Sequence, residues 1–141
     1  MSKGRMLSAG LLAVASWLAM PAAQAATTNE KAEMTGAEEV PGPGDPDGKG
    51  TANIVIDDAA NTVCFELTYS GLGKVTAAHI HTGAKGVAGP PAVTLKGDKG
   101  CTENVNPTTI QALRDDPGSH YVNIHTDEYK NGAIRGQLAK A

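Results

Sequence analysis

Three histidines and one arginine draw attention because they occur in segments where apolar residues take every second position. They are His79, His81, His125 and Arg135. The segments that carry them are 77–82, 121–126 and 132–138. Alternate side chains of a β-strand point to opposite faces. If the apolar residues face a core, all four of these groups therefore lie on the outer face.

The three histidines have the spacing of a metal site. His79 and His81 are two residues apart, so on a strand their side chains point the same way, about 6–7 Å apart. His125, on another strand, would complete a triangle. Imidazole suits copper and zinc, the affinity order favours copper, and three ligands with an open position are typical of reactive metal sites. The alternative is that these histidines hydrogen-bond to long loops and hold them in place.

Arg135 has two possible roles. It could attract an anion to a bound metal, or it could form an ion pair with Asp127 or Glu128. Two polar residues share the histidine face and either support the ligands or pack against loops: Tyr121 and Asn123. His120 has the opposite parity, so we expect it on the core side or at the strand edge.

Seven segments with alternating apolar residues predict the strands that position these groups. They are 34–40, 51–56, 62–69, 75–82, 92–95, 119–126 and 133–138. The one clear helix begins at Asn106-Pro107, carries Ile110 and Leu113 on one face, and ends at 116–118. The pattern predicts an all-β Greek-key sandwich or barrel of about seven to eight antiparallel strands with one short helix.

Glycine and proline mark the connections between these strands. The segment 41–48 is expected to be an exposed loop, because its prolines and glycines suit neither a helix nor a central strand. The segment 83–91 is expected to be a flexible connection. The segment 97–106 is expected to be a loop that carries Cys101.

The first 25 residues have the features of a secretory signal peptide. Lys3 and Arg5 precede an apolar run, and Ala23-Gln24-Ala25 offers small residues for cleavage. A membrane anchor is the alternative, but the run is short for a spanning helix of about 20 apolar residues. We therefore expect export to the periplasm or the medium, followed by a disordered leader over 26–33.

Composition limits the partners of the exported chain. Removing 25 of the 141 residues leaves 116, which suits one domain. Loss of Lys3 and Arg5 leaves 10 basic and 15 acidic residues, for a net charge of about −5. Such a chain is unsuited to nucleic acid, and after cleavage nothing is expected to hold it to a membrane. Export makes a disulfide between Cys64 and Cys101 the expected state, with free thiols or a thiol ligand as the alternative.

Four motifs, in this order, resemble the chordin-type (CHRD) domain. They are MTGAEEVP (34–41), VTAAHIH (75–81), YVNIHT (121–126) and GAIRGQL (132–138). The resemblance covers nearly all of the exported chain and implies one CHRD domain over 34–141. The family takes its name from an extracellular growth-factor antagonist of animals. The chain looks like the bacterial, exported, single-domain type.

A more distant likeness is to the copper/zinc superoxide dismutases, which have a His-Val-His strand, a later strand ending in Val-Val-His and a final Gly-Arg strand. It implies an eight-stranded Greek-key barrel with His79, His81 and His125 at three copper-ligand positions. Arg135 would then occupy the place of an anion-guiding arginine. The loop 83–91 has neither histidine nor aspartate. The bridging histidine and the zinc ligands thus have no counterpart, and no zinc site is expected.

The sequence therefore predicts an exported copper-binding domain, with binding favoured over catalysis. Superoxide dismutation is the one enzymatic activity that it suggests. Ser119 beside His120 does not make a triad, and no serine lies in a nucleophile elbow. The alternative function is a non-catalytic adhesion or ligand-binding module that presents its loops to an extracellular protein or a glycan.

Overall fold

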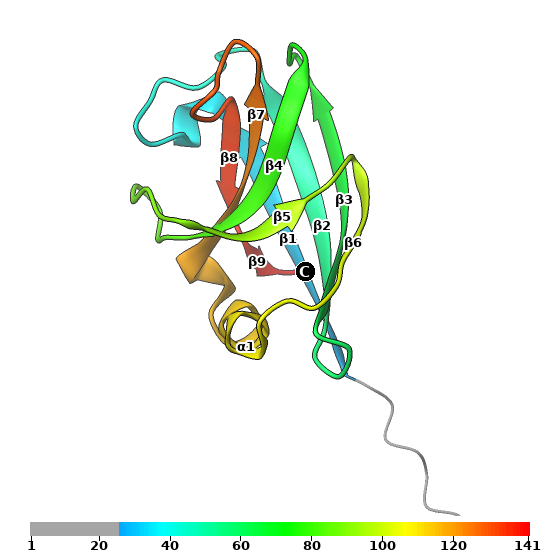
Figure 1. Ribbon diagram of the computed structural model, residues 1–141. Coiled ribbons are helices and arrows are strands. Elements are labelled where there is room, and N and C mark those ends of the chain that lie inside the picture. The colour runs from blue at the N-terminus through cyan, green and yellow to red at the C-terminus, as the bar shows by residue number, and fades with distance from the viewer. Residues whose placement is uncertain (1–25) are drawn as a thin grey trace, which may run out of the picture.

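The fold was analysed in a computed structural model, which describes residues 26–141 (Figure 1). The larger strands are β1 (Thr27–Thr35), β2 (Lys49–Asp57), β3 (Thr62–Ser70), β4 (Val75–Thr82), β5 (Pro91–Leu95), β7 (His120–Thr126) and β8 (Ile134–Gln137). Short elements complete the chain: β6 (Lys99–Thr102), β9 (Ala139–Lys140), the helix α1 (Pro107–Asp115) and the 3-10 turns η1 (Gly36–Glu38) and η2 (Pro117–Ser119).

The strands form a nearly closed antiparallel barrel. Eight of them are hydrogen-bonded in the order β5-β4-β7-β8-β1-β2-β3-β6, and β9 adds to β1. The two ends of this order meet where the Thr102 hydroxyl of β6 donates to the Thr94 carbonyl of β5, at 2.6 Å. Around the barrel β3, β6, β5 and β4 are neighbours in that order, which is a Greek-key arrangement. The predicted all-β fold class is confirmed.

The barrel interior is filled by the apolar residues that the alternation placed there. Ile80 and Ala78 of β4 face inward, as do Val122 and Ile124 of β7 and Ile134 of β8. All five are at most 4% exposed. Each inward residue fixes its strand neighbours on the outer side, which is how the core sets the direction of the histidines.

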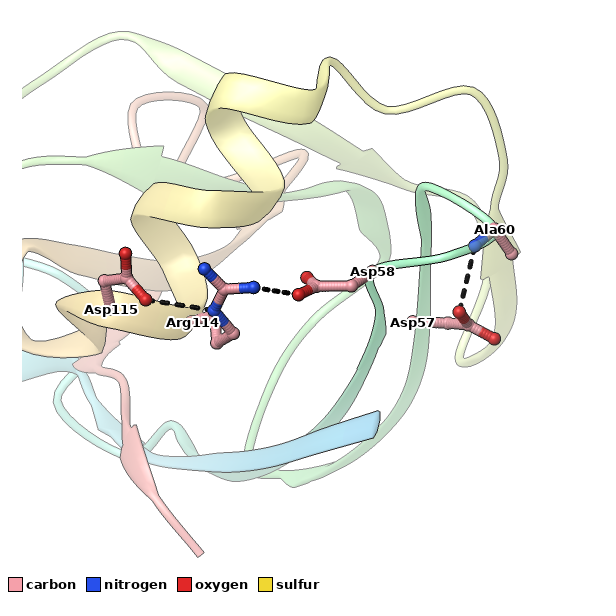
Figure 2. Close-up of polar contacts among 5 residues, drawn as sticks. All are labelled: Asp57, Asp58, Ala60, Arg114 and Asp115. Carbon is pink, nitrogen blue, oxygen red and sulfur yellow. Dashed lines mark hydrogen bonds and ion pairs between the residues drawn. The ribbon is translucent and has the colours of Figure 1, made fainter. Parts of the chain in front are cut away.

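The helix α1 covers one end of the barrel and agrees with its predicted limits. The Asn106 side chain caps it by accepting from the Thr108 amide at 2.8 Å, and Ile110 and Leu113 are buried. Figure 2 shows Arg114 of α1 paired with Asp58, in the turn that joins β2 and β3. This contact ties the helix to a hairpin that is remote from it in the sequence.

Three predictions about the N-terminal part of the barrel need correction. The strand expected over 34–40 ends at Thr35, where the turn η1 follows. The expected disordered leader over 26–33 forms most of β1, which pairs along its whole length with β2. The alternation was hidden because Glu30, a charged residue, takes an inward position and is 1% exposed. The loop 41–48 is only partly exposed, since Gly44, Asp45 and Gly48 are buried. The predicted signal peptide, 1–25, lies outside the described residues.

Cys64 and Cys101 form a disulfide between β3 and β6. The two residues are directly opposite each other in the ladder that joins these strands. The bond therefore fastens β6, the last strand in the order, to the rest of the sheet. A disulfide suggests an oxidising compartment. Within residues 26–141, no helix is both long and apolar enough to cross a bilayer.

Candidate metal centre

Strand register brings the predicted site residues together on the outer face of β4, β7 and β8. His79 is opposite Asn123, His81 is opposite Tyr121, and His125 is opposite Ala77. On the next strand Arg135 is opposite Asn123. The antiparallel pairing of β4 and β7 thus places residues 46 positions apart, His79 and His125, next to each other.

The three histidines converge closely enough to share one ion. One ring nitrogen from each of His79, His81 and His125 lies within 4.8 Å of the others. His79 Nδ1 and His125 Nε2 lie 3.4 Å apart. The His79 ring stands nearly perpendicular to those of His81 and His125, at 89° and 77°. All three side chains are only partly buried, so the cluster can be reached from solvent.

Backbone carbonyls fix the protonation of two rings. His81 Nδ1 lies 2.8 Å from the Gly89 oxygen, and His125 Nδ1 lies 2.9 Å from the Lys130 oxygen. A carbonyl can only accept, so each Nδ1 carries the proton and each Nε2 keeps its lone pair. Metal-binding histidines characteristically donate their second ring N–H in this way.

The donor atoms that remain fit a metal ion. His81 Nε2 is buried and has no hydrogen-bond partner among the described residues. On the other two histidines, His79 Nδ1 and His125 Nε2 lie 3.4 Å from each other. A buried lone pair without a donor is costly, and a metal ion bound to all three would remove that cost.

Electrostatics keep these rings available for a metal. Burial, followed by the nearby His125 and His81, lowers the pKa of His79. Burial is also the main cause that lowers the pKa of His81, against the opposing effect of its bond to Gly89. Both rings are therefore neutral at neutral pH, which is the form that binds metals.

Arg135 is on the predicted face but is not a surface residue. It is 1% exposed, and its Nη2 donates to the Ala84 carbonyl at 2.9 Å and to Gln137 Oε1 at 3.0 Å. Its guanidinium carbon lies 3.4 Å from the centre of the Tyr121 ring. Within residues 26–141 it forms no ion pair with Asp127 or Glu128, so that alternative is wrong. The prediction that it guides an anion stays a prediction.

Glu39 is a neighbour of the site that the sequence did not single out. It is 6% exposed, and burial raises its pKa to about 7, although the charge of Arg135 opposes this. Its carboxylate lies against Gly132, where a Cβ would come within 2.5 Å of three of its atoms. Glycine at 132 therefore allows Glu39, in the motif 34–41, to pack against the start of the motif 132–138. A glutamate in a loop motif carries no sequence signal of such burial.

The histidine cluster opens on a shallow depression of about 460 Å³. Its lining residues include His79 and His125 but not His81. Three small neutral residues and two charged ones complete the lining: Thr76, Ala77, Thr126, Asp127 and Lys130. An ion held by the three histidines would thus have an open side toward solvent, where a ligand or a reactant can approach.

The fourth histidine is not part of this cluster. His120 is 4% exposed, and its Nδ1 lies 3.1 Å from the Asp116 carbonyl. Its parity predicted this position. The alternative that the histidines hydrogen-bond to loops agrees with the contacts of His81 and His125. The sequence did not identify the acceptors, the carbonyls of Gly89 and Lys130, because a backbone acceptor has no residue type that marks it.

The fold and the cluster together define a class: a disulfide-linked β-barrel domain with three histidines that could hold a metal. The chain belongs to the CHRD domain family, which matches residues 31–138. The resemblance predicted from the four motifs is thus confirmed. Neither the curated proteins nor the solved structures compared with the chain gave a match.

Proposed function

We propose that this CHRD domain is an exported copper-binding domain, with His79, His81 and His125 as its ligands. The observation that carries the proposal is the convergence of three ring nitrogens within 4.8 Å. The carbonyl contacts of His81 and His125 support it, because they aim the Nε2 lone pairs before any metal binds. Copper is preferred over zinc because a given set of nitrogen ligands binds Cu²⁺ more tightly than Zn²⁺.

Bound copper would supply one-electron chemistry by alternating between two oxidation states. The open depression beside His79 and His125 would admit a small reactant such as superoxide. Arg135 would favour an anion through its field, from below the surface, rather than by contact. Binding is the primary proposal, and dismutation is the reaction that it would permit.

The deciding experiment is a copper titration of residues 26–141, the part that contains the whole barrel. We expect one tight equivalent, which is lost when His79, His81 and His125 are all replaced by alanine. The matched control is His120→Gln, which changes the histidine outside the cluster. Binding of one equivalent by this control and none by the triple variant supports the proposal. No binding by the unaltered protein, or equal binding by the triple variant, contradicts it.

A superoxide assay on the copper-loaded protein tests the finer proposal. Activity that disappears in the triple histidine variant would make the domain a dismutase. Tight binding without activity would leave storage or transfer of copper as its task.

A further inference from the structure

Three planar groups are layered beside the histidine cluster. The rings of His81 and Tyr121 are stacked, with centres 4.9 Å apart and an angle of 10° between their planes. The guanidinium carbon of Arg135 lies 3.4 Å from the centre of the same Tyr121 ring. Tyr121 is on β7, and the other two groups come from the strands on either side of it, β4 and β8. Tyr121 therefore connects a buried arginine to a histidine of the cluster.

The same groups hold the loop that orients His81. Gly89 accepts from His81 Nδ1, and its amide donates to the Tyr121 hydroxyl at 3.1 Å. Arg135 binds the other end of this loop through the Ala84 carbonyl. Gln137, which accepts from Arg135, donates to the Gly83 carbonyl at 3.0 Å. The loop 83–90 is thus tied at both ends to outward side chains of β7 and β8.

We infer that Arg135 is a positioning residue for His81, acting through Tyr121 and through the loop 83–90. Arg135 stacks on the Tyr121 ring and so holds that ring against the His81 imidazole. Its hydrogen bond to Ala84 fixes the loop, which keeps the Gly89 carbonyl where His81 Nδ1 can donate to it. The consequence is a single His81 tautomer with its Nε2 lone pair aimed at the cluster. The effect on copper rests on the proposed function, but the tautomer of the metal-free protein does not.

The chemistry of the side chains explains why arginine serves here. A guanidinium is planar, so it can stack on a ring with its face and still donate from its edge. Lysine has the same charge but neither the plane nor the fork of donors. Arg135 also does not line the depression on which the cluster opens, so direct contact with a bound reactant is not its role in this geometry.

The test compares Arg135→Lys with the unaltered protein in two states. In the metal-free state, ¹⁵N NMR of the imidazoles reports which nitrogen of His81 carries the proton. We expect the unaltered protein to show the Nδ1–H form alone and Arg135→Lys to show a mixture. In the copper-loaded state, we expect the affinity to fall by roughly 10- to 100-fold, the usual effect of losing an outer-shell partner. The copper electron paramagnetic resonance spectrum should also change.

Lys85→Ala is the matched control, because Lys85 is on the same loop but makes only an exposed ion pair with Glu38. It should leave both the tautomer and the affinity unchanged. A Tyr121→Phe and Tyr121→Leu pair serves if Arg135→Lys does not fold. The phenylalanine keeps the stack, so it should affect the tautomer less than leucine does.

The outcomes separate this inference from the proposed function. If Arg135→Lys folds and keeps the single tautomer and the copper affinity, the inference is overturned. Equal effects of the two Tyr121 variants would overturn the role of the stack. Should the unaltered protein bind no copper, the proposed function fails, and the NMR comparison still decides whether Arg135 positions His81.

Discussion

Two outer faces of this barrel follow the same strand alternation but meet different surroundings. On β4, β7 and β8 the outward residues include Tyr121, Asn123 and Arg135, and each is at most 3% exposed. On β2, β3 and β6 the outward residues include Glu66 and Lys99, whose side chains are 53% and 76% exposed. The first face lies against the loop 83–90 and Glu39, whereas the second faces solvent.

The difference shows that strand parity selects a face but not its environment. An outward charge costs little in water, while a buried one requires partners. Arg135 finds them in Tyr121, Ala84 and Gln137. On the solvated face the strongest link is covalent, the bond between Cys64 and Cys101. Each of the following predictions concerns one of these two faces.

The largest effect is expected on the solvated face, from removal of the disulfide. Replacing Cys64 and Cys101 by serine should lower the free energy of unfolding by about 4 kcal/mol, because the bond closes a loop of 37 residues. Copper affinity should not change, since the histidines lie on the other face. Urea unfolding and copper titration of the same samples check both points. A folded variant that has lost copper binding would show that the two faces are coupled.

The next effect concerns the pH dependence of stability and the face that the loop 83–90 and Glu39 cover. Burial raises the pKa of Glu39 from 4.5 to about 7. The folded state therefore favours the protonated carboxyl. The stabilisation that this protonated group contributes is fully present below about pH 4.5 and is lost as the pH rises through 7. The shift corresponds to roughly 3 kcal/mol. Glu39→Gln should make stability fall less between pH 5 and 8, as measured by denaturant unfolding.

Glu66→Gln, on the exposed face, is the control for this experiment and should leave the pH dependence as it is. Glu30 adds to the decline in the unaltered protein, because burial raises its pKa to about 7 as well. An identical pH profile for Glu39→Gln and the unaltered protein would mean that Glu39 is solvated.

A smaller effect is expected for copper affinity at mildly acidic pH. The pKa values of His79 and His81 are lowered, chiefly by burial, so protons compete for these two ligands only below the usual range of histidine. Affinity should change by less than about threefold between pH 8 and 7. Below the pKa of a ligand it should fall by about tenfold per pH unit for that histidine. A steep loss between pH 8 and 7 in a competition titration would argue against buried, neutral rings.

The smallest effect should come from the exposed ion pair between Lys99 and Glu66, at 3.2 Å. Lys99→Ala should change the free energy of unfolding by less than about 1 kcal/mol, because both side chains are largely solvated. Urea unfolding at low and high salt measures this. A change of several kcal/mol would mean that the solvated face is less open than the structure shows.

Most of the fold could be predicted from local pattern. Val122 and Ile124 alternate with polar residues, and this fixed both the strand and the outward direction of His125. The start of β1 could not be predicted in this way, since Glu30 interrupts the apolar positions of that strand. Burial of Glu30 depends on β9 and on strands that are distant in the sequence, which local alternation does not contain.

For the candidate site, too, the local pattern predicted the face of a residue but not its contacts. Parity placed His79 and His81 on one face, but only the register of β4 with β7 brought His125 within reach. The face of Arg135 was predicted correctly, but its burial was not. Nothing in its own segment indicates that the loop 83–90 packs over it. Glu39 was not predicted, since its partners are in the last motif of the chain.

The amino-acid sequence was sufficient for the type of fold, the limits of the helix and the face on which each histidine lies. These follow from side-chain alternation and capping, which act over a few residues. The tertiary structure alone decided that three histidines meet, that two carbonyls orient them and that a stacked tyrosine joins them to a buried arginine. Such contacts link residues far apart in the chain, so they exist only after the barrel has closed and its loops have packed.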